Sequence, residues 1–184
     1  MRLFVGFRPE IAVRDAFADV AHALGATVQA RFVPPELYHI TLAYLGERSA
    51  NALPGLMALL EDTAAVAAPF ALPALGLGFF GTPADAIVYA AFQQTEPLAS
   101  LNEQLRFRLA RAGESFDPRA LVPHLTLARK AVLPDGLPLT LARDLSCPVE
   151  ALTLFHSTRE QGTLQYLPVG EAPLAREPRR IPHP

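Results

Sequence analysis

The chain has 184 residues and a formal net charge of −2 at pH 7, with 51% hydrophobic and 18% charged residues. This size and composition are typical of one globular domain or of two small lobes that share a core. The small net charge argues against a protein that coats nucleic acid through bulk electrostatics, although it leaves room for a local basic site. A single cysteine, Cys147, excludes an internal disulfide and a cysteine zinc site. The apolar runs are too short to span a bilayer or to form a signal peptide, so we expect a monomeric cytoplasmic protein without a membrane or an obligate protein partner.

The first half of the chain alternates strand and helix patterns. Residues 2–8 predict a strand, and residues 9–25 predict a helix that opens on a proline and ends at a glycine. Two further strands are expected at 28–33 and 38–45, followed by a helix over 50–67.

The second half repeats this alternation, with a kinked strand and a returning strand at 70–80 and 86–92, a helix over 95–113, a strand at 123–129, and a hairpin formed by 149–158 and 163–169. We interpret the order of elements as an α+β fold. It consists of two pseudo-symmetric lobes of mostly antiparallel sheet, with helices outside and an active cleft between the lobes.

The domain is expected to cover residues 1–170. Residues 171–184 contain four prolines and three arginines and offer little that could pack. We therefore predict that this segment is a loose tail.

One pentapeptide pattern occurs twice, 85 residues apart. Residues 39–43 and residues 124–128 both read His-apolar-Thr-Leu-Ala, each within a strand-like context. Because successive side chains of a strand point to opposite faces, the histidine and threonine of each copy should share one face, while the flanking apolar residues should share the other. A lone His-x-Thr arises often by chance, but two copies in matching contexts indicate a functional pair.

Two such motifs facing each other would suit acid–base chemistry at phosphorus. One imidazole, His39 or His124, can accept a proton from water while the other donates a proton to a leaving oxygen. The hydroxyls of Thr41 and Thr126 can donate hydrogen bonds to a phosphoryl group held between them. This scheme needs no metal, no other cofactor and no nucleophile on the protein. Our preferred assignment makes His124 the general base and His39 the general acid.

Two residues outside the motifs are further candidates for the cleft. Tyr166 could stack on a nucleic-acid base, although a place in the core is the simpler interpretation. His156 lies in an expected strand and is a weaker candidate for the lining of the cleft.

The chain also resembles the 2H phosphoesterases, and within them the RNA 2′,3′-cyclic phosphodiesterases once described as 2′-5′ RNA ligases. The resemblance covers nearly the whole chain except the tail and lies in both motifs and in several supporting blocks, namely residues 2–5, 32–35, 44–46, 76–80, 152–155 and 162–166. It implies hydrolysis of 2′,3′-cyclic phosphates at RNA or nucleotide ends to 2′-phosphates. It also implies that Arg129 approaches the phosphate, yet simple strand alternation directs Arg129 away from His124, so this role requires a twist or a bulge.

The sequence departs from the family pattern at two positions. A tryptophan is common where Phe32 stands, and a lysine where Ala43 stands. Loss of the cation would weaken RNA contact only if a regular strand placed Ala43 on the cleft face. Alternatives left open are a module that binds RNA ends or nucleotide phosphates without turnover, and a 2′-5′ RNA ligase activity from the same site.

Overall fold

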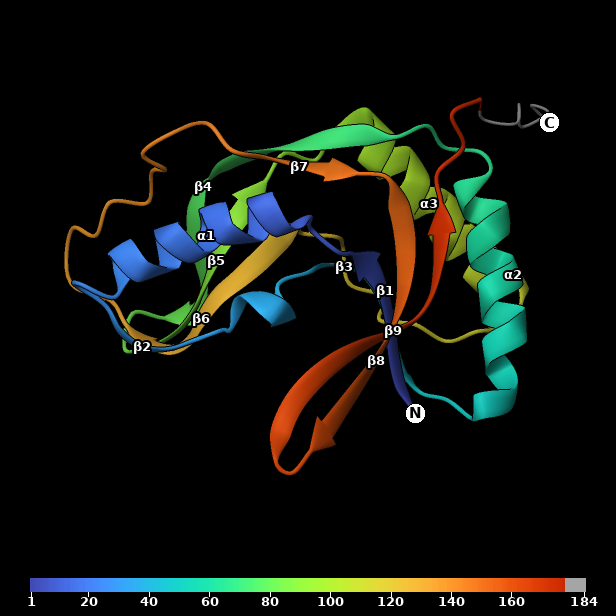
Figure 1. Cartoon of the computed structure of the whole chain (residues 1–184), viewed down its shortest axis with the longest axis horizontal. Helices are drawn as coiled ribbons and strands as arrows, with labels where there is room; N and C mark the ends of the chain where they lie inside the picture. The colour runs from blue at the N-terminus through green and yellow to red at the C-terminus, as the bar shows by residue number, and fades with distance from the viewer. Residues whose placement is uncertain (178–184) are drawn as a thin grey trace.

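The computed structural model describes residues 1–177. These residues form a nine-stranded sheet in the order β7-β4-β5-β6-β3-β1-β8-β9, with β2 paired to β6 outside this path (Figure 1). The strands are β1 (Arg2–Phe7), β2 (Gln29–Phe32), β3 (Ile40–Glu47), β4 (Phe70–Thr82), β5 (Asp85–Phe92), β6 (His124–Val132), β7 (Ser146–Val149), β8 (Ala151–Glu160) and β9 (Thr163–Pro173). The helices are α1 (Ile11–Leu24), α2 (Leu53–Ala64) and α3 (Glu96–Arg111), with 3₁₀ turns η1 (Pro35–Leu37) and η2 (Ala50–Ala52).

The strand order has a pseudo-two-fold arrangement about the boundary between β3 and β6. Read outward from this boundary, one lobe is β3-β1-β8-β9 and the other is β6-β5-β4-β7, and every pairing is antiparallel. Each lobe also has a strand–helix–strand path, because α1 lies between β1 and β3 in the chain and α3 lies between β5 and β6. The predicted α+β fold with two pseudo-symmetric lobes is confirmed.

The helices cover the sheet with narrow apolar stripes. Thr95 caps α3 by accepting a hydrogen bond from the backbone N–H of Leu98, and the buried leucines of α3 recur at helical spacing, at positions 98, 101, 105 and 109. Helix α1 lies beside β4, β5 and β6, whereas α2 and α3 lie side by side at the other lobe (Figure 1). No helix in the described part of the chain is long and apolar enough to cross a membrane.

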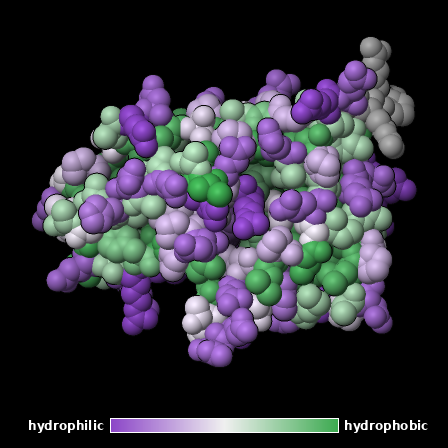
Figure 2. All heavy atoms as spheres, in the orientation of Figure 1, coloured by the Kyte–Doolittle hydropathy of each residue, from purple (hydrophilic) through white to green (hydrophobic). Residues whose placement is uncertain are grey.

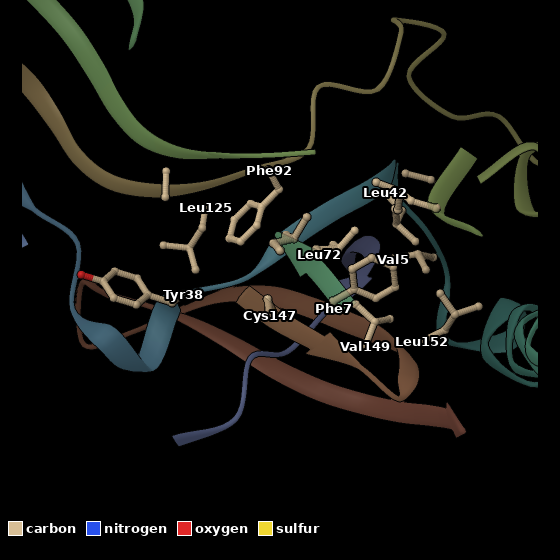
Figure 3. Packing of buried hydrophobic residues seen from close by; sticks show 14 of the residues in the cluster. Val5, Phe7, Tyr38, Leu42, Leu72, Phe92, Leu125, Cys147, Val149 and Leu152 are labelled. Atoms are coloured by element: carbon tan, nitrogen blue, oxygen red, sulfur yellow. The ribbon is translucent and has the colours of Figure 1, made fainter. Parts of the chain in front are cut away.

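The core is continuous through both lobes. Figure 3 shows Phe7 of β1 close to Leu72, Cys147 and Val149 from the β4–β7 pair, so side chains of the two lobes pack together. The Cys147 side chain is fully buried, and burial raises the pKa of its thiol to about 12, with a further contribution from Glu10. This cysteine is a packing residue. The outer surface seen in Figure 2 is covered mostly by hydrophilic side chains, with smaller apolar patches between them.

The C-terminal segment differs from the sequence-based expectation. Strand β9 continues to Pro173 in register with β8, Ala172 and Leu174 are buried, and the backbone N–H of Ala175 donates to carbonyl oxygens at the end of α2. The predicted loose tail is therefore wrong at its start, because the alanine and leucine between the prolines provide enough apolar surface to dock. Residues 178–184 of the predicted tail lie outside the described residues.

The expected strand at 149–158 is also divided differently. Strand β7 pairs with β4 in one lobe, and after Glu150 the chain continues as β8, which pairs with β1 in the other lobe. One apolar run therefore serves both lobes. Strand β7 buries alternate residues, whereas β8 buries the four consecutive residues 152–155.

Gly6 permits the closest approach between β1 and β3, and this yields a stability prediction. A Cβ at this position would collide with the carbonyl oxygen of Ile40. Gly6→Ala should lower the free energy of unfolding by about 3 kcal/mol, because backbone on both sides would have to shift. Urea unfolding would measure this change.

Gly55→Ala is the matched control, because no atom lies within 4 Å of a Cβ built there and the position is inside α2. It should stabilise the protein by up to about 1 kcal/mol through helix propensity. Equal effects of the two substitutions would contradict the close approach at Gly6.

Candidate functional site

The two motifs meet at the centre of the sheet. Ile40 of β3 pairs with Leu125 of β6, and both side chains are fully buried. Extended by one residue on either side, the antiparallel register of this single pair would put His39 opposite Thr126 and Thr41 opposite His124. Residues that oppose each other across a strand pair point to the same face. The four polar side chains of the motifs therefore project from one face, and the buried apolar pair projects from the other.

Both motif strands contain a β-bulge at the same position. Thr41 opposes Gly6, and Ala43 opposes Val5, so Leu42 is an extra residue in β3. The same step occurs in β6, where Leu127 is the extra residue. Each bulge breaks the alternation, so that two consecutive residues, leucine and alanine, are buried and the next residue is exposed.

The bulges decide two questions left by the sequence. In β6 the residue after the bulge is Arg129, which is exposed and lines the same cavity as His39 and Thr126. In β3 the bulge buries Ala43, which is only 3% exposed and does not lie on the cleft face. The alanine in place of the common lysine at position 43 therefore removes no cation from the cleft face.

Both imidazoles are held by the same local hydrogen bond. Nδ1 of His39 lies 2.7 Å from the carbonyl oxygen of Leu37, and Nδ1 of His124 lies 2.7 Å from the carbonyl oxygen of Val122. A carbonyl can only accept, so Nδ1 carries the proton in each ring and the neutral imidazole has its lone pair on Nε2. Each motif thus presents Nε2 as the reactive nitrogen.

Aromatic side chains fix the orientation of both rings. The His39 ring centroid lies 4.9 Å from that of Phe4 and 4.7 Å from that of Tyr166. The His124 ring centroid lies 5.1 Å from that of Phe80 and 5.3 Å from that of Tyr89. Phe4 and Tyr89 come from the adjacent strands β1 and β5, whereas Tyr166 and Phe80 come from β9 and β4, further out in the two lobes. Among these partners the sequence indicated only Tyr166.

Burial sets the protonation state of His39. Burial, acting with the nearby charges of His124 and Arg129 and against the hydrogen bond to the Leu37 carbonyl, lowers the pKa of this imidazole to about 4. His39 is therefore neutral at pH 7 in the ligand-free protein. The hydrogen bond made by Nδ1 of His124 is exposed to solvent, whereas that made by Nδ1 of His39 is partly buried.

A cavity of about 240 Å³ opens beside His39. Three cationic side chains line part of it and are called here the cationic wall: Arg31, Arg129 and Lys130. The apolar residues of the lining, called here the apolar wall, are Phe32, Val33, Pro34, Leu37, Leu164 and Tyr166, and the motif residues His39 and Thr126 complete the lining. Larger hollows exist, such as one of about 610 Å³ between α1 and residues 137–145, but these hold none of the motif residues.

The two remaining candidates, Tyr166 and His156, differ in whether they lie at the cavity. Tyr166 lines the cavity against His39, and burial raises the pKa of its hydroxyl. His156 pairs with the fully buried Leu3 and points away from the face that carries Phe155 and His39. Arg31 and Lys130 were not predicted, because their position depends on the pairing of β2 with β6 and on an irregular strand.

No group of three or more histidine, cysteine, aspartate or glutamate side chains among residues 1–177 is arranged to hold a metal ion. The polar groups around the motifs are imidazole, hydroxyl and guanidinium groups.

Comparisons with known proteins identify relatives of this chain. Residues 9–161 match the model of the 2′-5′ RNA ligase superfamily. RNA 2′,3′-cyclic phosphodiesterase of Thermus thermophilus is 33% identical over 85% of this chain and 82% of its own length. A relative of the same name from Geobacillus stearothermophilus is 31% identical over 80% of this chain, which spans about half (48%) of that protein.

Solved structures are similar over almost the full length. The crystal structure of TT0787 of Thermus thermophilus has a TM-score of 0.80 at 28% identity, covering 95% of this chain and 98% of that one. The structure of E. coli LigT complexed with 3′-AMP has a TM-score of 0.78 at 26% identity, covering 94% and 97%. The fold is that of the 2H phosphoesterases. The chain belongs to the 2′-5′ RNA ligase superfamily.

The lowered pKa of His39 predicts a pH dependence of stability. The unfolded chain protonates His39 near its ordinary pKa of 6.5, whereas the folded protein does so only near pH 4. Between these values the unfolded state holds more protons, so this contribution to stability is complete above pH 6.5 and is lost as the pH falls toward 4. The urea midpoint of the wild type should fall across this window more steeply than that of His39→Gln. Parallel curves would contradict a buried neutral imidazole.

Proposed function

We propose that this protein is an RNA 2′,3′-cyclic phosphodiesterase that hydrolyses 2′,3′-cyclic phosphates at RNA or nucleotide ends and leaves a 2′-phosphate. The observation that carries the proposal is the placement of His39 and His124 on one face at the junction of the lobes, each with its Nδ1 proton held by a carbonyl. The curated relatives of that name support the same reaction.

The substrate's phosphate lies between the motifs, and its nucleoside enters the neighbouring cavity. Thr41 and Thr126 donate hydrogen bonds to the phosphoryl oxygens, and Arg129 balances the negative charge with its planar guanidinium. The base packs on the apolar wall, where Tyr166 offers an aromatic face. No protein nucleophile and no metal takes part in the proposed reaction.

The position of the cavity supports one assignment of the two proton transfers. The leaving oxygen belongs to the ribose, which sits in the cavity lined by His39 but not by His124. His39 therefore protonates the leaving 3′-oxygen, and the more exposed His124 removes a proton from the attacking water. The water oxygen forms the new bond to phosphorus, the bond from phosphorus to the 3′-oxygen breaks, and the phosphate stays on the 2′-oxygen.

Because His39 is neutral in the ligand-free protein, it must take up a proton before it can act as the general acid. A general acid must carry a proton, and His39 does not carry one at pH 7 before substrate binds. The bound phosphodiester brings a negative charge next to the imidazole, which raises its pKa and favours proton uptake. Substrate binding thus favours the protonated form of His39 that the general acid requires.

Replacement of either histidine should abolish most of the turnover. His39→Ala and His124→Ala should each lower kcat by about 10²–10⁴-fold on a nucleoside 2′,3′-cyclic phosphate, because each removes one proton transfer. The double variant should be far less impaired than the product of the two single effects. Assays in the presence of a chelator, with the product identified by phosphorus NMR, would measure rate and regiochemistry together.

His156→Ala is the matched control, because this imidazole points away from the cleft, and it should retain nearly the wild-type rate. A predominant 3′-phosphate product would reverse the proposed orientation, and loss of activity in the chelator would contradict the metal-free scheme. Binding without turnover by the wild type would instead identify a module that recognises RNA ends.

Substrate-coupled protonation of His39 is testable separately. NMR titration of the imidazole should give a pKa near 4 in the free protein and a clearly higher pKa in the complex with a nucleoside 2′-phosphate. A pKa that stays near 4 in the complex would exchange the roles of the two histidines, because only a neutral His39 could then act.

A further inference from the structure

The cationic wall of the cavity contains an unfavourable pair of charges. Arg31 of β2 stands directly opposite Arg129 of β6. Like charges that face each other across a strand pair destabilise the sheet. None of the ion pairs formed within residues 1–177 involves Arg31, Arg129 or Lys130. An anion between these side chains would remove the repulsion.

A second irregularity directs Lys130 to the same wall. The pairing of β5 with β6 advances two residues from Ala86 to Val88 while β6 advances three, from Ala131 to Ala128. Lys130 has a φ of 52°, in the left-handed region that side-chain-bearing residues rarely adopt. Consecutive residues of a regular strand face opposite sides, yet Arg129 and Lys130 are both exposed and both line the cavity.

One reactive phosphate does not account for three cations. Arg129 lies close enough to His39 to affect its pKa, which places Arg129 beside the reactive phosphate. Arg31 and Lys130 line the cavity as well, and neither takes part in an ion pair within residues 1–177. Their charge is therefore available to a second anionic group of the same substrate.

We propose that Arg31 and Lys130 form a second phosphate subsite, which binds the phosphate on the 5′ side of the terminal nucleoside. This inference rests on the proposed function, because the cyclic phosphate and its nucleoside must occupy the motifs and the cavity. A guanidinium and an ammonium group that line the same cavity suit the oxygens of a phosphate. The subsite makes an RNA end, or a nucleotide that bears a 5′-phosphate, a better substrate than a nucleoside cyclic phosphate with a free 5′-hydroxyl.

Two substrates that differ only at the 5′ position test the subsite. The wild type should hydrolyse 5′-phosphoadenosine 2′,3′-cyclic phosphate with a kcat/KM at least about tenfold above that for adenosine 2′,3′-cyclic phosphate, since a charge-assisted contact is worth about 1.4 kcal/mol or more. In Arg31→Gln and Lys130→Gln this ratio should fall toward one. The preference should also weaken with added salt in the wild type, and less so in the variants.

Arg111→Gln is the control, because Arg111 lies at the end of α3 against Phe107 and away from the cavity. It should keep the wild-type ratio. A wild-type ratio of one, or variants that lose activity equally on both substrates, would overturn the subsite. The urea midpoint of Arg31→Gln should equal or exceed that of the wild type, because the substitution removes the repulsion with Arg129.

Binding separates failure of the subsite from failure of the proposed function. Calorimetry should show that adenosine 2′,5′-bisphosphate binds at least about tenfold more tightly than adenosine 2′-phosphate, and that Arg31→Gln removes the difference. If this difference is present but neither cyclic substrate is turned over, the subsite stands and the hydrolase proposal fails. Equal affinities would overturn the subsite whatever the activity.

Discussion

The single pairing of Ile40 with Leu125 is the contact on which the site depends. It joins two four-stranded lobes that have the same order of strands, and it fixes the register between their motifs. Both side chains are fully buried, so a slip of one residue would expose them and turn every motif side chain to the other face. Because exposing these two side chains would cost free energy, the register is stable and the polar groups of the motifs keep their positions. A hydrophobic contact therefore determines where His39 and His124 stand.

Departures from regular strand geometry shape the rest of the cleft. The equivalent bulges at Leu42 and Leu127 let each motif strand bury two consecutive residues and still present a side chain beyond them. The lobes then differ in what they present. One offers Tyr44 at this place and the other offers Arg129, so the cationic wall forms on one side of the pseudo-two-fold only. This asymmetry gives a bound substrate a direction.

The sequence predicted the fold class, most of the strands and helices, and the common face of each motif, because these follow from periodicity and a repeated pattern. The sequence analysis placed the end of the domain too early, because the nearby prolines obscured two apolar residues, Ala172 and Leu174, that are buried in the structure. It also left Arg129 undecided and missed Arg31. Bulges and strand neighbours arise from tertiary pairing, and a local pattern in one segment does not encode them.

A crystal structure of the complex with adenosine 2′-phosphate would show whether both motifs hold the same phosphate. We expect one phosphate between the lobes, with Nε2 of both His39 and His124 and the hydroxyls of Thr41 and Thr126 within hydrogen-bond distance of its oxygens. The nucleoside should lie in the cavity beside Tyr166. A phosphate held by the cationic wall alone, with either imidazole out of reach, would contradict the proposed catalytic roles of the two histidines.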